Sequence, residues 1–132
     1  MSNIKTDVLI IGGGPSGAPS ASILRKQGLD VTIIEKTKFP RFVIGESLLP
    51  LCMDLLDEAD LLEAVEKKNF QKKHGAAFIK GNDTCDFDFS EQYSKNWSWT
   101  WQVQRSEFDK TLIDEVEKKG TTVLFESTVE NV

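Results

Sequence analysis

Cysteine, histidine and long apolar runs are all scarce in this sequence. It contains two cysteines, Cys52 and Cys85, and one histidine, with no CxxC pair. These counts exclude a disulfide framework and a zinc site built from Cys and His, so we expect no metal. The longest unbroken apolar run near the N-terminus is Val8 to Ile11. It is far shorter than the roughly 20 residues that cross a bilayer, so we expect no membrane span.

Positive charge and secretory features are also lacking. The chain carries 16 Lys and Arg against 21 Asp and Glu, a net charge of −5. A negative surface does not attract the phosphates of nucleic acids, so we expect no nucleic-acid partner. No basic segment is followed by an apolar core of the kind found in signal peptides. Together with unpaired thiols, this predicts a cytoplasmic protein.

The first 40 residues encode a strand, a turn, a helix and a second strand. Residues 7–11 and 30–35 are short β-branched apolar runs, typical of strands buried on both faces of a parallel sheet. Between them a helical pattern covers residues 16–27 and ends at Gly28. We therefore predict an α/β fold that opens with a Rossmann-like βαβ unit over residues 1–40.

The turn of this unit carries the glycine pattern of a dinucleotide site. Gly12, Gly14 and Gly17 fit G-x-G-x-x-G directly after a predicted strand. In this pattern the first glycine allows a tight turn, the second lets backbone approach a diphosphate, and the third lets the helix pack on the strand. Glu35 ends the second strand, where a carboxylate accepts hydrogen bonds from ribose hydroxyls. The pattern therefore predicts that an adenine dinucleotide binds here.

Pro19 stands where the helix after this turn should be running. Inside an established helix a proline costs about 3 kcal/mol, but in the first turn it removes no hydrogen bond that the helix needs. We expect the first turn to be displaced or kinked around residues 16–19, with the phosphate-binding turn intact.

Residues 41–104 are predicted to form connecting helices and a small antiparallel insertion. Pro50 favours a helix start, and that helix continues to Glu58. A second helix begins near Asp60, which with Glu63 has the spacing of a capping box. Residues 76–80 and 84–89 are predicted to form a hairpin.

The end of the insertion and the segment after it complete the predicted fold. Tryptophans alternate with polar residues over 97–103, which indicates one buried strand face. In residues 105–132 we expect Ser106 to cap a helix over 107–119. A third parallel strand is predicted at residues 121–126.

Three segments together resemble the flavoprotein monooxygenases of the p-hydroxybenzoate hydroxylase superfamily. They read IIGGGPSGAPSA, IIEKTKFPRFVIGESLLP and WQVQRSEFDKTLIDEV. The flavin-dependent halogenases and the geranylgeranyl-reductase-like enzymes are the most similar branches. This resemblance implies FAD as the cofactor and residues 1–132 as a partial FAD-binding domain. It also implies that Gly45, Glu46 and Ser47 lie beside the flavin.

The third segment and the long connection add further residues to the expected site. The resemblance implies that Arg105 contacts FAD, with Gln102 as its neighbour. Arg41 either binds phosphate or lies at the surface in solvent. Motif and resemblance together give the cofactor-binding set Gly12, Gly14, Pro15, Ser16, Gly17, Glu35, Lys36, Arg41, Gly45, Glu46, Ser47, Gln102 and Arg105.

The sequence is compatible with more than one reaction of the bound flavin. Halogenases of this superfamily use a lysine to direct hypohalous acid to substrate, and Lys73 lines up with it; the alternative is a solvated strand-edge lysine. The run WSWTWQV does not match the halogenase signature W-x-W-x-x-I-P, since no proline follows. A lipid reductase, a non-catalytic nucleotide-binding remnant, and NAD in place of FAD stay open as alternatives.

Elements that complete the superfamily's flavin and substrate sites have no counterpart in these 132 residues. We therefore expect the N-terminal portion of a longer FAD-dependent oxidoreductase that acts on a small-molecule substrate. Its electron source would be a flavin reductase or NAD(P)H. By itself the chain is expected to hold FAD weakly and to lack turnover.

Overall fold

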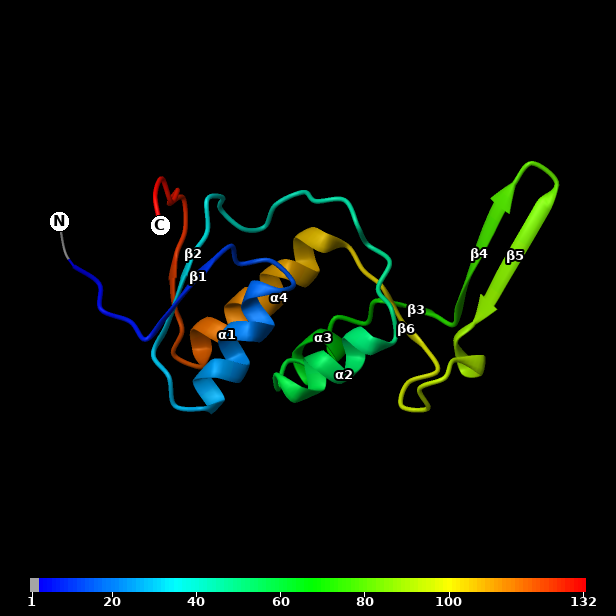
Figure 1. Cartoon of the computed structure of the whole chain (residues 1–132), viewed down its shortest axis with the longest axis horizontal. Coiled ribbons are helices and arrows are strands. Elements are labelled where there is room, and N and C mark those ends of the chain that lie inside the picture. Colours follow the sequence, from blue (N-terminus) through cyan, green and yellow to red (C-terminus); the bar gives the residue numbers. More distant parts are fainter. Residues whose placement is uncertain (1–2) are drawn as a thin grey trace.

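A three-stranded parallel sheet lies at one end of the molecule, as the computed structural model shows for residues 3–132 (Figure 1). Strands β1 (Val8–Ile11), β2 (Val31–Ile34) and β7 (Thr122–Leu124) run in the order β1-β2-β7. Both pairings are parallel, with Ile10 opposite Ile33 and Ile33 opposite Val123. The predicted βαβ unit and third parallel strand are confirmed.

Two helices, α1 (Gly17–Lys26) and α4 (Arg105–Lys118), pack side by side on one face of this sheet (Figure 1). Ala18 and Ala21 have no solvent exposure, and their small side chains let α1 lie close to the strands. Burial of apolar side chains here supplies most of the driving force for folding. The core cluster from these elements includes Ala18, Ala21, Val31, Ile33, Phe108, Leu112, Ile113 and Val116.

Two shorter helices, α2 (Leu51–Glu58) and α3 (Leu62–Glu66), extend the core beside α1 and α4. The expected capping box at the start of α3 is wrong. Asp60 has a left-handed φ of 54°, and the Leu61 amide donates to the Leu56 carbonyl at 2.8 Å. This is a Schellman-type end of α2, so Asp60 closes the preceding helix instead of opening the next one.

Helix α4 begins two residues earlier than the sequence predicted. Its N-cap is Gln104 in extended conformation, and Ser106 lies in the first turn without capping it. The Phe108 amide donates to the Gln104 carbonyl at 2.9 Å. Arg105 is therefore a helical residue, which fixes the direction of its side chain.

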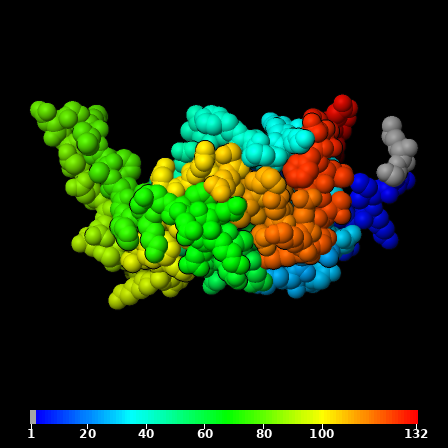
Figure 2. Space-filling model, turned by 180° about the vertical axis from the view of Figure 1, so that it is seen from behind, coloured from blue at the N-terminus to red at the C-terminus, as the bar shows by residue number. Residues whose placement is uncertain are grey.

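Two antiparallel strand pairs lie at the other end of the molecule. In the sequence they fall between the second and third parallel strands, as predicted. Strand β3 (Gln71–Lys73) pairs with β6 (Thr100–Gln102), and β4 (Gly75–Lys80) pairs with β5 (Asp83–Asp88). The short 3₁₀ turn η1 (Phe89–Glu91) follows β5. The β4–β5 hairpin projects from the body as an arm, seen from both sides in Figures 1 and 2.

Only part of the tryptophan-rich segment 97–103 forms the predicted strand, namely β6 at Thr100–Gln102. Trp97 and Trp99 lie before β6 and are half-buried, and the three indoles stack edge to face with centroids 5.5 and 5.3 Å apart. Trp101 is buried. Within the described residues, none of the helices combines the length and apolarity needed to cross a membrane.

Candidate functional site

The glycine turn joins the end of β1 to the start of α1. Gly12 has a φ of 101°, and its amide donates to the Ile34 carbonyl at 2.8 Å. A Cβ on Gly17 would lie 2.0 Å from the Gly12 carbonyl oxygen, so only glycine fits there. A Cβ on Gly14 would meet nothing closer than the Arg41 guanidinium at 3.5 Å. The fold therefore requires glycine at positions 12 and 17, whereas position 14 has space for a small side chain.

Three amides of this turn have no hydrogen-bond partner anywhere in residues 3–132: those of Gly14, Ser16 and Gly17. They lie at the N-terminus of α1, where unpaired N–H groups and the helix dipole together favour an anion. Pro15 lies among them and has no N–H to offer.

The expected kink at Pro19 is wrong. The Ala18 amide donates to the Gly14 carbonyl at 3.1 Å, and the Ser20 amide donates to the Ser16 carbonyl at 3.2 Å. Regular helical bonding thus continues on both sides of the proline. Pro19 is the third residue of α1, and only its own bond is missing, so the turn has no reason to move.

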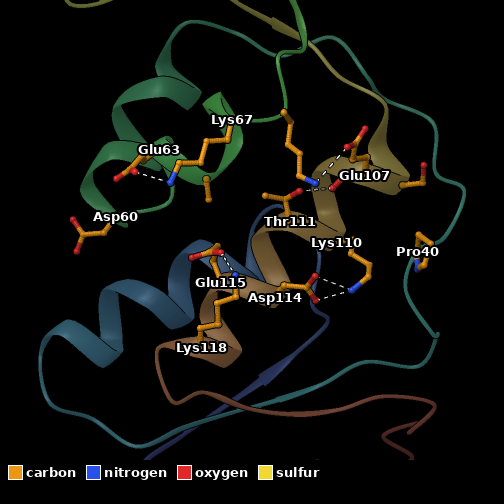
Figure 3. A pocket seen from close by; sticks show the side chains of 13 residues that line it. Pro40, Asp60, Glu63, Lys67, Glu107, Lys110, Thr111, Asp114, Glu115 and Lys118 are labelled. Atoms are coloured by element: carbon orange, nitrogen blue, oxygen red, sulfur yellow. Dashed lines mark hydrogen bonds and ion pairs between the residues drawn. The ribbon is translucent and has the colours of Figure 1, made fainter.

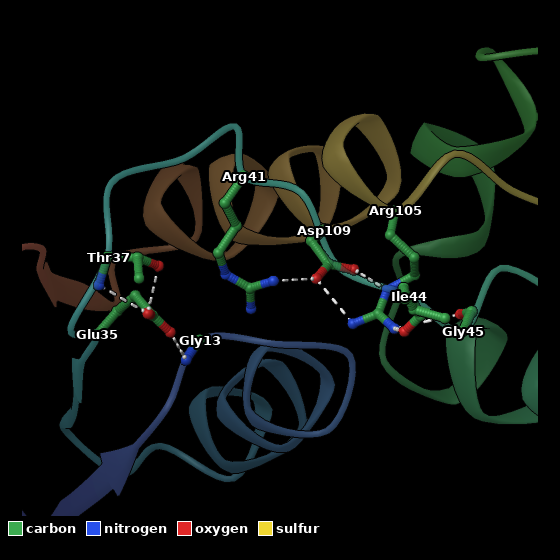
Figure 4. Close-up of polar contacts among 8 residues, drawn as sticks. All are labelled: Gly13, Glu35, Thr37, Arg41, Ile44, Gly45, Arg105 and Asp109. Atoms are coloured by element: carbon green, nitrogen blue, oxygen red, sulfur yellow. Dashed lines mark hydrogen bonds and ion pairs between the residues drawn. The ribbon is translucent and has the colours of Figure 1, made fainter.

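Glu35 is buried beside the turn, with 4% of its surface exposed. Its Oε2 accepts a hydrogen bond from the Gly13 amide at 2.9 Å (Figure 4). Its Oε1 accepts from the Thr37 amide at 2.9 Å and from the Thr37 hydroxyl at 2.7 Å. Burial opposes ionisation, but these bonds and the charge of Arg41 outweigh it and lower the pKa of Glu35. A carboxylate has about four acceptor positions, so one remains for a further hydroxyl.

Two arginines share one buried carboxylate above the helix N-terminus (Figure 4). Arg41 donates from Nη1 to Asp109 Oδ2 at 3.0 Å, and Arg105 donates from Nε to Oδ1 at 2.8 Å and from Nη2 to Oδ2 at 3.0 Å. The hydrogen bonds to Asp109 outweigh burial and raise the pKa of Arg105. Two cations on one anion leave one positive charge in excess, next to the unpaired amides.

A cleft of about 550 Å³ opens beside Glu35 and Arg41. Lys36 is exposed at its wall. The cleft is lined by Ile11, Gly12, Ile34, Glu35, Lys36, Thr37, Arg41, Phe42, Val43, Ser127, Thr128 and Val129. The cleft thus borders Gly12 of the glycine turn, the ionised carboxylate of Glu35, and Arg41.

The remaining expected residues lie further along the connection from β2 to α2. Gly45 has a φ of 107°, and its carbonyl accepts from Arg105 Nη1 at 3.2 Å. The Glu46 carbonyl accepts from the Val103 amide at 2.8 Å, while its side chain is exposed. Ser47 pairs with Gln102 in an isolated antiparallel bridge.

Lys73 contacts the same connection from β3. Its ammonium donates to the Ser47 hydroxyl and, at 3.3 Å, to the Leu48 carbonyl. It also lies 5.1 Å from the centre of the Phe89 ring. Lys73 therefore contacts the α2 end of the connection, at Ser47 and Leu48, whereas Glu35 and the glycine turn lie at its β2 end. Strand β3 lies apart from β1 and β2 in Figure 1.

A groove of about 650 Å³ between α3 and α4 contains none of the expected site residues (Figure 3). Its charged side chains neutralise one another: Lys110 bonds Asp114 at 2.7 Å and Lys118 bonds Glu115 at 2.6 Å. Both pairs are largely exposed, where such ion pairs contribute little. This surface offers no unpaired charge to a ligand.

Sequence reasoning missed Asp109 and Thr37. Arg105 and Asp109 are four residues apart on one helix, a spacing that places them face to face and could have been recognised. No local signal joins Arg41 to Asp109, because the two are 68 positions apart. Among the described residues no group of three His, Cys, Asp or Glu is placed to hold a metal ion.

Comparison with known proteins identifies the family. The model of the FAD binding domain family matches residues 5–132. The tryptophan 2-halogenase of Chondromyces crocatus is 38% identical over 118 residues, which are 89% of this chain and 22% of that protein.

Two solved structures share the fold. A flavoprotein/dehydrogenase from Cytophaga hutchinsonii has a TM-score of 0.88 and 55% identity, over 95% of this chain and 31% of its own. The flavin-dependent halogenase CmlS has a TM-score of 0.87 and 40% identity, over 98% of this chain and 24% of its own. The chain spans between 22% and 31% of the length of these three proteins. From its glycine turn to β7, the chain belongs to the FAD binding domain family.

Proposed function

We propose that the glycine turn, Glu35 and Arg41 hold the ADP half of FAD. The observation that carries this proposal is the set of three unpaired amides, at Gly14, Ser16 and Gly17, beside an arginine pair with one excess positive charge. A diphosphate carries two negative charges and matches both features.

The residues present fit this cofactor. Gly14 has open space where a side chain would otherwise block a diphosphate from the backbone. Glu35 is ionised, is held by Gly13 and Thr37, and keeps one acceptor position for a ribose hydroxyl. Lys36 lines the same cleft and adds positive charge. When bound, FAD supplies the redox chemistry of its isoalloxazine ring.

In this proposal Arg41 binds phosphate, whereas Arg105 holds the backbone of the connection. Arg41 Nη2 lies 3.5 Å from the Cβ position of Gly14 and is free to bind a phosphate oxygen. Arg105 donates to Asp109 and to the Ile44 and Gly45 carbonyls, so it holds the connection instead of contacting phosphate directly. This assignment differs from the one that the resemblance implied for Arg105.

The far end of the connection is proposed as the flavin side of the site. Gly45, Glu46, Ser47 and Gln102 line a hollow of about 390 Å³ there. Lys73 is proposed as the catalytic lysine, since Ser47 and the Leu48 carbonyl hold its ammonium at the edge of this connection. Two of its three N–H donors are thereby engaged, which leaves one to bind a reacting oxygen.

The activity of the whole protein is proposed from its relatives. Two of the three relatives compared above are halogenases, so we propose halogenation or hydroxylation of a small molecule; the reductase alternative gains no support from them. A flavin reductase or NAD(P)H is the proposed electron source. The proposed location is the cytoplasm, consistent with the free thiols of Cys52 and Cys85. Residues 1–40, 41–104 and 105–132 are proposed as three parts of one FAD-binding unit.

Titration of the purified chain with FAD, ADP and riboflavin tests this function. FAD and ADP should bind with affinities within about tenfold of each other, and riboflavin, which lacks the diphosphate, should not bind measurably. Gly14→Val should weaken both ligands while leaving the urea midpoint unchanged, because position 14 has space. Riboflavin binding as tightly as FAD, or unaltered binding by Gly14→Val, would contradict the proposal. Binding of FAD by a longer chain without any turnover would favour a nucleotide-binding module.

A further inference from the structure

We propose that Asp109 is a positioning residue that couples diphosphate binding at Arg41 to the placement of residues 44–47. The proposal rests on the function proposed above. It assigns to one buried carboxylate the link between the ADP end of the site and the connection that reaches Ser47.

Asp109 is fixed in place before any ligand arrives. Its side chain is 1% exposed, and its oxygens accept three hydrogen bonds of 2.8 to 3.0 Å from the two guanidiniums. It projects from α4, whose neighbouring residues Phe108 and Leu112 are in the core. A buried carboxylate with this many charged donors sets the positions of both donors, because each charge-assisted hydrogen bond is strong and directional.

The two donors lead in opposite directions. Arg41 extends one N–H group toward the glycine turn, where the diphosphate is proposed to bind. Arg105 directs Nη1 to the carbonyls of Ile44 at 3.3 Å and Gly45 at 3.2 Å. Arg105 therefore holds the backbone of the connection at its midpoint.

Little else holds this part of the connection. The side chains of Phe42 and Ile44 are 85% and 82% exposed, so the connection is not anchored by burial of either side chain. Its next fixed points are the Glu46 carbonyl and Ser47, which contact Val103 and Gln102. A shift of Arg105 consequently moves Ile44 and Gly45 more readily than it moves the core.

The charges of Arg41, Arg105 and Asp109 determine whether diphosphate binding orders or loosens the connection. Without ligand, the two guanidiniums repel each other across one carboxylate. A diphosphate on Arg41 offsets the excess positive charge and so weakens the repulsion between the two guanidiniums, which should strengthen the hydrogen bonds of Arg105 to Asp109. The connection should therefore be more ordered when a diphosphate is bound, and by linkage an ordered connection should favour the diphosphate.

Hydrogen exchange on the intact chain, with ADP as the probe, tests this coupling. ADP has no isoalloxazine, so it cannot cover residues 44–47 in the way that the flavin would. Saturating ADP should slow amide exchange over residues 44–47 about fivefold or more in the wild type. Asp109→Asn and Arg105→Gln should abolish this protection, and Asp109→Glu should restore part of it.

The affinity for ADP distinguishes a positioning role of Asp109 from an effect of its charge alone. Asp109→Asn removes a negative charge, which alone would tighten ADP; lost positioning of Arg41 should instead weaken ADP about tenfold. Arg105→Gln should change ADP affinity by no more than about fivefold, the effect of one screened charge. Tighter ADP binding by Asp109→Asn would contradict a positioning role.

The remaining outcomes are equally decisive. Unchanged exchange over residues 44–47 in ADP-bound wild type, or protection that persists in folded Arg105→Gln, would overturn the coupling while leaving the proposed function intact. No ADP binding by the wild type would overturn the proposed function itself. If Asp109→Asn fails to fold, the Arg105→Gln result decides.

Discussion

The sheet end of the molecule and the β4–β5 arm are built in opposite ways. Around β1, α1 and β2, residues such as Ala18, Ala21 and Ile33 have no solvent exposure. In the arm every residue of β5 is exposed, and Phe78 and Phe87 stack edge to face at 62% and 55% exposure. The first region is held by a core and the second mainly by its backbone ladder.

This difference shows which parts of the chain can bind an anion unaided. Unpaired amides and a shared buried carboxylate keep their geometry only where packing fixes the backbone, as at the start of α1 and α4. The arm has apolar surface but no such fixed polar groups. We therefore expect nucleotide binding to depend on the sheet end and to be indifferent to the arm.

The largest effect is expected at Gly17. A Cβ at this position would lie 2.0 Å from the Gly12 carbonyl, so Gly17→Ala forces α1 away from β1. We expect a loss of about 3 kcal/mol in the free energy of unfolding, measured in urea, together with loss of FAD binding. Gly14→Ala is the matched control and should unfold within about 1 kcal/mol of the wild type. Equal stability of the two variants would show that the turn is not as close as described.

Arg41 should have the next largest effect, on affinity rather than on stability. Arg41→Ala removes a charged donor from the proposed phosphate site and should weaken FAD about 10- to 100-fold. Lys38→Ala removes the same charge from an exposed neighbour and should cost less than about threefold. Isothermal titration of the two variants measures the contrast, and similar losses would indicate a diffuse charge effect.

Glu35 should give a smaller effect that depends on pH. Its pKa in the folded chain is lowered from the ordinary 4.5, so its ionised form stabilises the fold above that pH. This contribution is lost as the pH falls through the lowered pKa. Glu35→Gln should cost about 1–2 kcal/mol at pH 7 and flatten the fall in unfolding free energy below pH 4.5.

Glu130→Gln is the control for this titration, because Glu130 is exposed and its side chain makes no hydrogen bond among the described residues. It should leave the pH profile of the wild type unaltered. A Glu35→Gln profile that matches the wild type would mean that the Gly13 and Thr37 bonds do not stabilise the carboxylate.

The smallest effect is expected in the arm. Phe78→Ser removes the edge-to-face contact with Phe87 but little other packing, since Phe78 is already 62% exposed. Its unfolding free energy should stay within about 1 kcal/mol of the wild type, and its FAD affinity should be unchanged. A change in affinity comparable with that of Arg41→Ala would break the contrast between the two regions.

The sequence predicted the parts of the fold that local patterns determine. The βαβ unit followed from two β-branched runs and three glycines, and the end of α1 followed from Gly28, whose φ is 84°. The hairpin predicted at residues 76–80 and 84–89 is present as β4 and β5. In each case the local conformational demand and the tertiary structure agree.

The failures occurred where two local signals competed or a long-range contact decided. Asp60 suits both a helix start and a left-handed helix end, and the end of α2 prevailed. Asp109 became the centre of the site only because the connection after β2 brings Arg41 to it across 68 positions. Neither the charges of Arg41 and Asp109 nor their spacing along the chain predicts this contact.

The amide resonances of Gly14, Ser16 and Gly17 test the central claim most directly. In a ¹H–¹⁵N titration of the labelled chain with ADP, these three amides should shift saturably and together, while those of β4 and β5 stay in place. Saturable ADP binding that leaves all three amides unmoved would contradict the account.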